Sequence, residues 1–220
     1  ATSLKDRVKS YFNQDLINSR GPRLTSMLEQ ANTVTWQETD SVLEALLLET
    51  ALIKKYQPKY NAKEKDDKSY WYIVITKEDF PQILQVRGRN LEVEPPSGGS
   101  TSFGPFVSGS ELKEALKIIR QIFPYRDARC KPNQGKVYPE QSRRACFNRQ
   151  IGLCPGVCTG EISKADYAKT VRNLKLFFNG KKGMVVKNLE REMKRLAKAK
   201  EFERAVKVRN QIFALNHIRD

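Results

Sequence analysis

All four cysteines of this 220-residue chain lie between positions 130 and 158, and this cluster constrains the fold more than any other feature. Cys130, Cys146, Cys154 and Cys158 are separated by 15, 7 and 3 residues. The sequence reads as cytosolic, where disulfides are uncommon. The cluster therefore predicts a tetrathiolate centre that holds structural Zn²⁺ or an iron–sulfur cluster. Buried cysteines without a metal are the alternative.

The net charge of +15 is unevenly distributed along the chain. Residues 163–220 carry 16 basic and 6 acidic side chains, whereas residues 1–61 carry 8 and 7. Such an excess favours a polyanionic partner such as nucleic acid, although a solvated helical surface would give the same count. Four arginines near the cysteines either offset thiolate charge or reach DNA phosphates: Arg129, Arg143, Arg144 and Arg149.

Two further classes of protein are excluded by composition. The single histidine argues against a His-rich zinc site and against a Ser-His-Asp triad. No apolar run approaches the roughly 20 residues that a membrane-spanning helix needs, so we expect a cytoplasmic protein without a membrane partner.

The hydrophobic periodicity predicts an α+β fold. Strands are expected at residues 33–38, 69–76 and 82–87, and residues 97–100 and the Gly104-Pro105 step are expected to lie in loops. Helices are expected at residues 41–56, 110–122, 163–178, 184–199 and 201–218, with Ser41 as the N-cap of the first of these.

Glu49 is the first candidate functional residue. On a helical wheel of residues 41–56 it falls inside an apolar arc about 120° wide. A carboxylate on an apolar face needs a cation, hydrogen bonds or a metal, since burying it alone is costly. Arg7, beside Tyr11 on a short opening helix, is a candidate partner. A plain ion pair or a position at the rim of the core is the alternative.

The last two predicted helices form an antiparallel hairpin with an apolar stripe on each helix. The stripes consist of Leu189, Met193 and Leu196 on the first helix and of Phe202, Ala205, Val206, Ile212 and Phe213 on the second. Two short helices have too little core to stand alone. The hairpin therefore packs against the rest of the chain or leaves an apolar surface for a partner.

Several strings of the sequence resemble the UvrC family of bacterial excinuclease subunits. They are LKDRVKSYF at 4–12, ETDSVLEALLLE at 38–49, LIKKYQPKYN at 52–61, KDDKSY at 65–70, FGPF at 103–106, QIGLCP at 150–155 and FERA at 202–205. The resemblance covers essentially the whole chain in the family's order. It implies a partial GIY-YIG nuclease domain at 1–65, a small α/β linking region at 66–128, a cysteine region at 129–162 and a helical region at 163–220, with a UVR motif at about 187–218.

The resemblance also implies a function in nucleotide excision repair. The family's N-terminal half incises damaged double-stranded DNA on the 3′ side of the lesion. Its catalytic arginine falls on Arg7, its metal-binding glutamate, which holds Mg²⁺ or Mn²⁺, on Glu49, and further site residues on Asn61 and Tyr11. The four cysteines match the ligands of a [4Fe–4S] cluster, with Zn²⁺ as the alternative. Phe202, with Ala205 and Val206 beside it, falls in the helix pair that contacts UvrB.

The sequence departs from the family pattern at three points. Ala1 aligns just after the family's YIG segment, whose tyrosine activates the water, so we expect this chain to be inactive or impaired as a nuclease. Trp71 stands where the family usually has proline, and the interval from Cys130 to Cys146 is longer than usual. Two alternative functions are a non-catalytic fragment that binds DNA and UvrB, and a standalone GIY-YIG nuclease without repair partners.

Overall fold

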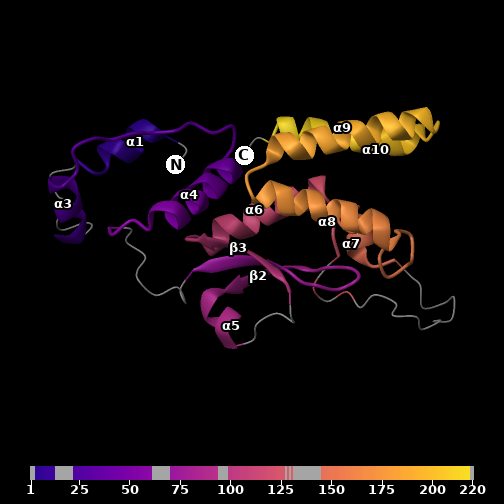
Figure 1. Ribbon diagram of the computed structural model, residues 1–220, viewed down its shortest axis with the longest axis horizontal. Helices are drawn as coiled ribbons and strands as arrows, with labels where there is room; N and C mark the ends of the chain where they lie inside the picture. The colour runs from indigo at the N-terminus through magenta and orange to yellow at the C-terminus, as the bar shows by residue number, and fades with distance from the viewer. Residues whose placement is uncertain are drawn as a thin grey trace.

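The structure is a computed structural model that describes residues 3–12, 22–60, 70–93, 99–126, 128, 130 and 145–218. It has the predicted α+β architecture (Figure 1). The strands are β1 (Trp71–Ile75), β2 (Ile83–Arg87) and β3 (Thr101–Phe106). The helices are α1 (Leu4–Lys9), α3 (Pro22–Glu29), α4 (Val42–Tyr56), α5 (Gly88–Val93), α6 (Gly109–Ile122), α7 (Phe147–Gln150), α8 (Lys164–Phe178), α9 (Lys182–Lys198) and α10 (Phe202–Asn216).

The three strands form one antiparallel sheet in the order β2-β1-β3. The central strand is the most apolar, and Ile73, Val74 and Ile75 are buried. The expected loop at Gly104-Pro105 is wrong, because both residues belong to β3. Pro105 argued against a strand because proline has no N–H group to donate to the hydrogen bonds of a sheet. β3 is an edge strand, and an edge strand tolerates proline.

The predicted strand at residues 33–38 is also wrong. Residues 31–39 have no regular secondary structure, and Val34 and Trp36 are exposed. Apolar and polar residues do alternate here as they would in a strand, but this segment pairs with none of the three strands in the sheet.

The predicted long helices are confirmed, and serine caps set the start of three of them. Ser41, Ser108 and Ser163 each accept a hydrogen bond from the backbone N–H three residues later, at the start of α4, α6 and α8. Each cap satisfies an N–H group that has no partner inside its own helix. The sequence signal was therefore local, which explains why it was reliable.

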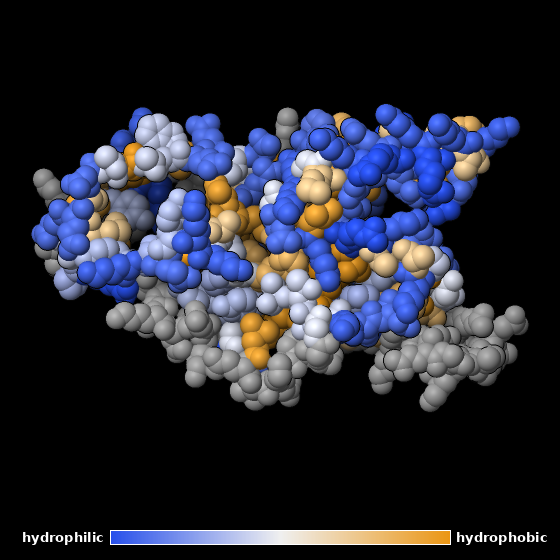
Figure 2. Space-filling model, in the orientation of Figure 1, coloured by the Kyte–Doolittle hydropathy of each residue, from blue (hydrophilic) through white to orange (hydrophobic). Residues whose placement is uncertain are grey.

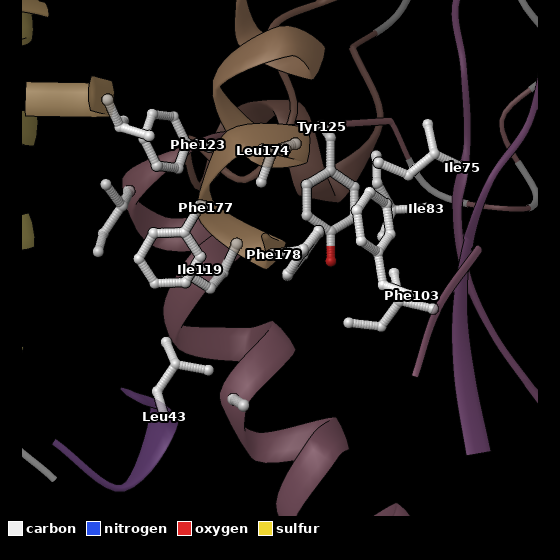
Figure 3. Packing of buried hydrophobic residues seen from close by; sticks show 14 of the residues in the cluster. Leu43, Ile75, Ile83, Phe103, Ile119, Phe123, Tyr125, Leu174, Phe177 and Phe178 are labelled. Carbon is white, nitrogen blue, oxygen red and sulfur yellow. The ribbon is translucent and has the colours of Figure 1, made fainter. Parts of the chain in front are cut away.

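One hydrophobic core joins the sheet to the helices (Figure 3). Leu112, Ala115, Ile119 and Ile122 recur at helical spacing along α6 and are buried. Figure 3 shows Ile119 near Phe123 and Phe177, with Ile83 and Phe103 toward the sheet. α4, α8, α9 and α10 also contribute side chains to this core.

The α9–α10 hairpin lies beyond α8 from the sheet, and two contacts fasten its open end, where α9 begins and α10 finishes (Figure 1). The Lys182 ammonium at the start of α9 lies 2.5 Å from Glu44 on α4 and 3.6 Å from Asp40. On the returning helix, the Gln211 side chain in the last two turns of α10 donates to the Ile122 carbonyl at 2.7 Å. The hairpin is thus connected both to α4 and to α6. Within the described ranges, we find no helix with the length and apolar character to cross a membrane.

Candidate functional site

The helix α4 presents apolar side chains to two different environments. Leu43, Leu46 and Leu47 face the core. The opposite flank borders a hollow of about 400 Å³ that also receives residues from the segments before and after the helix. Its lining consists of Gln37, Thr39, Ala45, Leu48, Glu49, Leu52, Ile53, Tyr56 and Pro58.

Glu49 lies on the wall of this hollow and is exposed. The helical wheel placed Glu49 in an apolar arc that was expected to pack against the core. One edge of that arc, with Leu46, does so, but the part around Glu49 borders the hollow instead. Leu52 and Tyr56 in that arc are exposed as well. The wheel failed because the helix is apolar around most of its circumference, so periodicity could not decide which side faces the sheet.

The electrostatics of Glu49 involve residues from two distant segments. Although Glu49 is exposed, the apolar side chains around it displace water from part of its surroundings; this loss of solvation raises the pKa of its carboxyl, and the charge of Glu111 on α6 raises it further. The Arg7 guanidinium opposes both effects and lowers this pKa. The Arg7 guanidinium also lies over the Tyr11 ring, 5.4 Å from its centroid. The structure thus associates Arg7 with both Glu49 and Tyr11, whereas Asn61 lies outside the described residues.

Glu111 does not line the hollow, but its charge acts on Glu49, and sequence reasoning missed this connection. It occupies the first turn of α6, and nothing in the local pattern connects it with a glutamate 62 positions earlier. The connection arises because α4 docks on the sheet, where the Thr50 hydroxyl donates to the Pro105 carbonyl of β3 at 3.2 Å. An exposed carboxylate, a guanidinium and an open hollow are together suited to a hard cation and a phosphate.

All four cysteines are free thiols in different degrees of burial. Cys154 is buried, Cys130 and Cys158 are half-buried, and Cys146 is exposed at the start of α7. The Cys130 thiol hydrogen-bonds to Cys158. Among the residues that the structure describes, no three His, Cys, Asp or Glu side chains are arranged to hold a metal ion.

The thiols nevertheless interact with one another. Burial raises the pKa of Cys130 to about 12, and the charges of Cys158 and Cys154 add to this effect. Burial also raises the pKa of Cys158, with Cys146 as the next cause. At neutral pH these thiols are therefore protonated, and a metal would have to displace their protons to bind. The donor set fits Zn²⁺ or an iron–sulfur cluster in chemistry, with one sulfur pair already in contact.

Arg126 anchors the first cysteine and was not predicted. It is the one charged side chain that is buried in the described structure, with 1% of its surface exposed. Its guanidinium pairs with Glu78 at 2.5 Å and donates to the Phe80 carbonyl at 2.5 Å and to the Cys130 carbonyl at 2.8 Å. The Tyr167 hydroxyl accepts from its backbone N–H at 3.2 Å. A buried guanidinium therefore ties the cysteine segment to the loop between β1 and β2.

Three family models match successive parts of the chain. The UvrC-like GIY-YIG domain matches residues 1–62, the UvrC/Cho excinuclease middle domain matches residues 70–177, and the UvrB/uvrC motif matches residues 185–218. This chain belongs to the UvrC family. The GIY-YIG match contains Arg7 and Glu49, so the residues that line the hollow lie within the part of the chain that matches this domain.

Individual UvrC proteins match along the whole chain. The UvrABC system protein C of Clostridium kluyveri is 38% identical over 99% of this chain and 33% of its own length. The corresponding protein of Caldanaerobacter subterraneus is 39% identical over 99% of the chain and 34% of its own length, and that of Methanospirillum hungatei is 37% identical over 99% and 38%. The chain thus spans about a third of the curated relatives it matches. No solved structure matches it.

The UvrB/uvrC motif of this UvrC family member covers the α9–α10 hairpin. Phe202 and Val206 lie on its surface, with 63% and 41% of their areas exposed, whereas Ala205 is buried. Of the four arginines predicted near the cysteines, Arg149 lies in the described structure, where its Nε donates to Glu161 at 2.8 Å and its Nη2 pairs with the same carboxylate. Arg129, Arg143 and Arg144 lie outside the described residues.

Proposed function

We propose that this chain is part of a nucleotide-excision-repair endonuclease subunit that cuts damaged double-stranded DNA on the 3′ side of the lesion. The observation that carries the proposal is the position of Glu49 on the wall of an open hollow, where the positive charge of Arg7 lowers the pKa of its carboxyl. Both residues lie in the part of the chain that matches a UvrC-like GIY-YIG domain. DNA as the substrate is also consistent with the net charge of +15. Such a protein works in the cytoplasm, where bacterial DNA lies.

The proposed chemistry assigns one role to each site residue. Glu49 would hold Mg²⁺ or Mn²⁺, which supplies a Lewis acid at a scissile phosphate oxygen. Arg7 stabilises the negative charge that develops on that phosphate. Tyr11 holds the Arg7 guanidinium in place through its ring, at a centroid distance of 5.4 Å. Asn61 completes the set that the resemblance to UvrC proteins implies.

An incision assay on a lesion-containing duplex tests this function. With UvrB and Mg²⁺ present, we expect a single cut 3′ of the lesion that disappears when the metal is chelated. The 220 residues contain no GIY or YIG tripeptide. We therefore expect them to cut far more slowly than a UvrC chain that carries this segment and its tyrosine. Metal-independent cutting, or cutting that ignores the lesion, would contradict the proposal.

The exposed part of α10 is proposed as the surface for UvrB. Replacing Phe202 by Ala should weaken UvrB binding about 30-fold, because removing an exposed aromatic anchor from an interface costs about 2 kcal/mol. Phe147→Ala is the matched control, since Phe147 is equally exposed but lies on α7 near the cysteines. A binding titration in which both variants lose the same affinity would show that Phe202 has no specific role.

The cysteine region is proposed to hold a [4Fe–4S] cluster, with Zn²⁺ as the alternative. Support comes from four free thiols that influence one another's charge and from a Cys130–Cys158 pair in contact. Protein purified without oxygen should be brown and contain about four iron atoms per chain. Cys154→Ser should lose most of this iron. A colourless wild type with one zinc per chain would identify the alternative, and a wild type that binds neither metal would refute the centre.

A further inference from the structure

The α9–α10 hairpin carries two exposed stripes of different chemistry. On α10, Phe202, Val206 and Phe213 fall within an arc of about 40° at 100° per residue and are exposed. On α9, four cations fall within an arc of about 60°, and all four are exposed. We call the second set the basic stripe; its members are Lys187, Arg191, Lys194 and Lys198.

The basic stripe points away from the rest of the molecule. The buried residues of α9 are Val185, Leu189 and Leu196, which lie on the opposite side of the helix. Figure 2 shows the resulting surface over the hairpin as mostly hydrophilic. The stripe is thus free to meet a partner without any change in the fold.

The cations of the basic stripe lack the acidic partners that other cations of the hairpin have. Arg195 pairs with Glu192 at 2.6 Å, Arg204 with Glu201 at 2.5 Å and Lys182 with Glu44 at 2.5 Å. Within the described residues, none of the four stripe cations forms an ion pair.

The stripe is not wholly without polar neighbours. The Arg191 side chain donates to the neutral oxygens of Asn188 and Lys187. Glu190 borders the stripe on one side without pairing with it. The positive charge of the stripe is therefore left largely unneutralised by the protein itself.

The dimensions of the basic stripe suit a nucleic-acid backbone. Eleven helical steps from Lys187 to Lys198 span about 16 Å. One strand of duplex DNA carries a phosphate about every 3.4 Å along its axis, so the stripe runs beside about five phosphates. α9 also begins at the Lys182–Glu44 contact with α4, the helix that carries Glu49. A duplex along the stripe would therefore extend from the neighbourhood of the candidate nuclease site.

We propose that the basic stripe binds the phosphate backbone of duplex DNA, while the apolar stripe of α10 remains available to a protein partner. This inference rests on the proposed function, from which it takes DNA as the polyanion. Long, flexible lysine side chains on a solvent-facing helix contact phosphates without reading bases. Binding through the stripe is therefore independent of sequence and strongly dependent on salt.

The test compares two charge-matched variants of the 220-residue chain. The stripe variant combines Lys187→Gln, Arg191→Gln, Lys194→Gln and Lys198→Gln. The control variant combines Lys113→Gln, Lys117→Gln, Lys200→Gln and Lys207→Gln, which removes four exposed cations outside the stripe. Fluorescence anisotropy with an undamaged 30-base-pair duplex at 50 to 200 mM salt gives the affinity and its salt dependence. Circular dichroism and melting temperature check that both variants fold.

We expect the stripe variant to bind about 30-fold more weakly at 100 mM salt and to reduce the magnitude of the salt slope by about 3.6, which is about 0.9 for each of the four lost phosphate contacts. The control variant should lose less than about threefold in affinity. Equal losses in the two variants would overturn the proposal, because net charge alone would then explain binding. A stripe variant that keeps its DNA affinity but loses UvrB would assign the stripe to a protein partner instead. A wild type that binds no DNA would refute the proposed function itself.

Discussion

Glu49→Gln is expected to lower the rate of 3′ incision about a thousandfold, which corresponds to about 4 kcal/mol of lost transition-state stabilisation. The amide has nearly the shape of the carboxylate but no negative charge, so it cannot hold a divalent cation against a phosphate. The incision assay with UvrB measures this loss under single-turnover conditions, with the substitution placed in a UvrC chain that carries the GIY-YIG segment and its tyrosine. Rates within threefold of the wild type would remove Glu49 from the site.

Glu44→Gln is the matched control for that variant. Glu44 lies five residues earlier on α4 and pairs with Lys182, outside the hollow. We expect it to retain incision within about threefold and to lose about 1 kcal/mol of stability, since the pair with Lys182 is about four-fifths covered and glutamine keeps a polar group there. If both glutamines abolished incision alike, the effect would come from α4 as a whole.

Glu49→Gln should not lose stability, in contrast to Glu44→Gln. Burial and the charge of Glu111 raise the pKa of Glu49 in the folded protein. The ionised carboxylate is therefore less favourable in the folded than in the unfolded state, and this penalty is present at pH 7 and disappears as the pH falls below the usual pKa of 4.5. Glutamine carries no such penalty, so the variant should melt at the same or a higher temperature. A loss of activity with full stability would separate a chemical role from a structural one.

The sequence predicted those elements whose signals are local. The serine caps and apolar periodicity of α4, α6 and α8 lie within a few residues of each other, and their bounds were nearly correct. β3 was missed because its assignment depends on pairing with β1 rather than on its own residues. The segment at 33–38 was mistaken for a strand for the same reason, since alternation alone supplies no partner.

In the candidate site, too, local features could be predicted from the sequence and features that depend on tertiary packing could not. Glu49 was found because a carboxylate among apolar side chains is a local anomaly. Its real environment depends on tertiary packing, which decides that Leu43 faces the core and that Leu52 does not. Glu111 could not be found from spacing, because the docking of α4 on β3 brings its charge near Glu49.

Arg126 shows most clearly what packing adds to sequence. Arginine is rarely fully buried unless it is paired, so a lone Arg before a cysteine segment predicts an exposed cation. In the structure its partners come from both sides of the chain: Glu78 and Phe80 from the loop between β1 and β2, and Cys130 from the segment that follows. With the Gln82 amide oxygen turned toward it, Nη1 and Nη2 each gain a further acceptor at 3.2 and 3.1 Å.

Arg126→Met is therefore expected to destabilise the protein by about 3 kcal/mol. Methionine fills much of the volume, but it leaves the Phe80 and Cys130 carbonyls without their donor and Glu78 without its cation. Urea unfolding at pH 7 measures the loss. The release of Cys130 should also speed its alkylation by iodoacetamide under native conditions, because the guanidinium fixes its backbone.

Arg149→Met is the control that distinguishes burial from simple ion pairing. Arg149 also pairs with a glutamate, Glu161, but both side chains are partly exposed, so the pair contributes about 0.5 kcal/mol. A loss six times greater for Arg126 would mean that the stability lies in the number of buried acceptors it satisfies, not in its charge. Equal losses would instead place Arg126 among ordinary surface pairs, and Cys130 would then need another anchor.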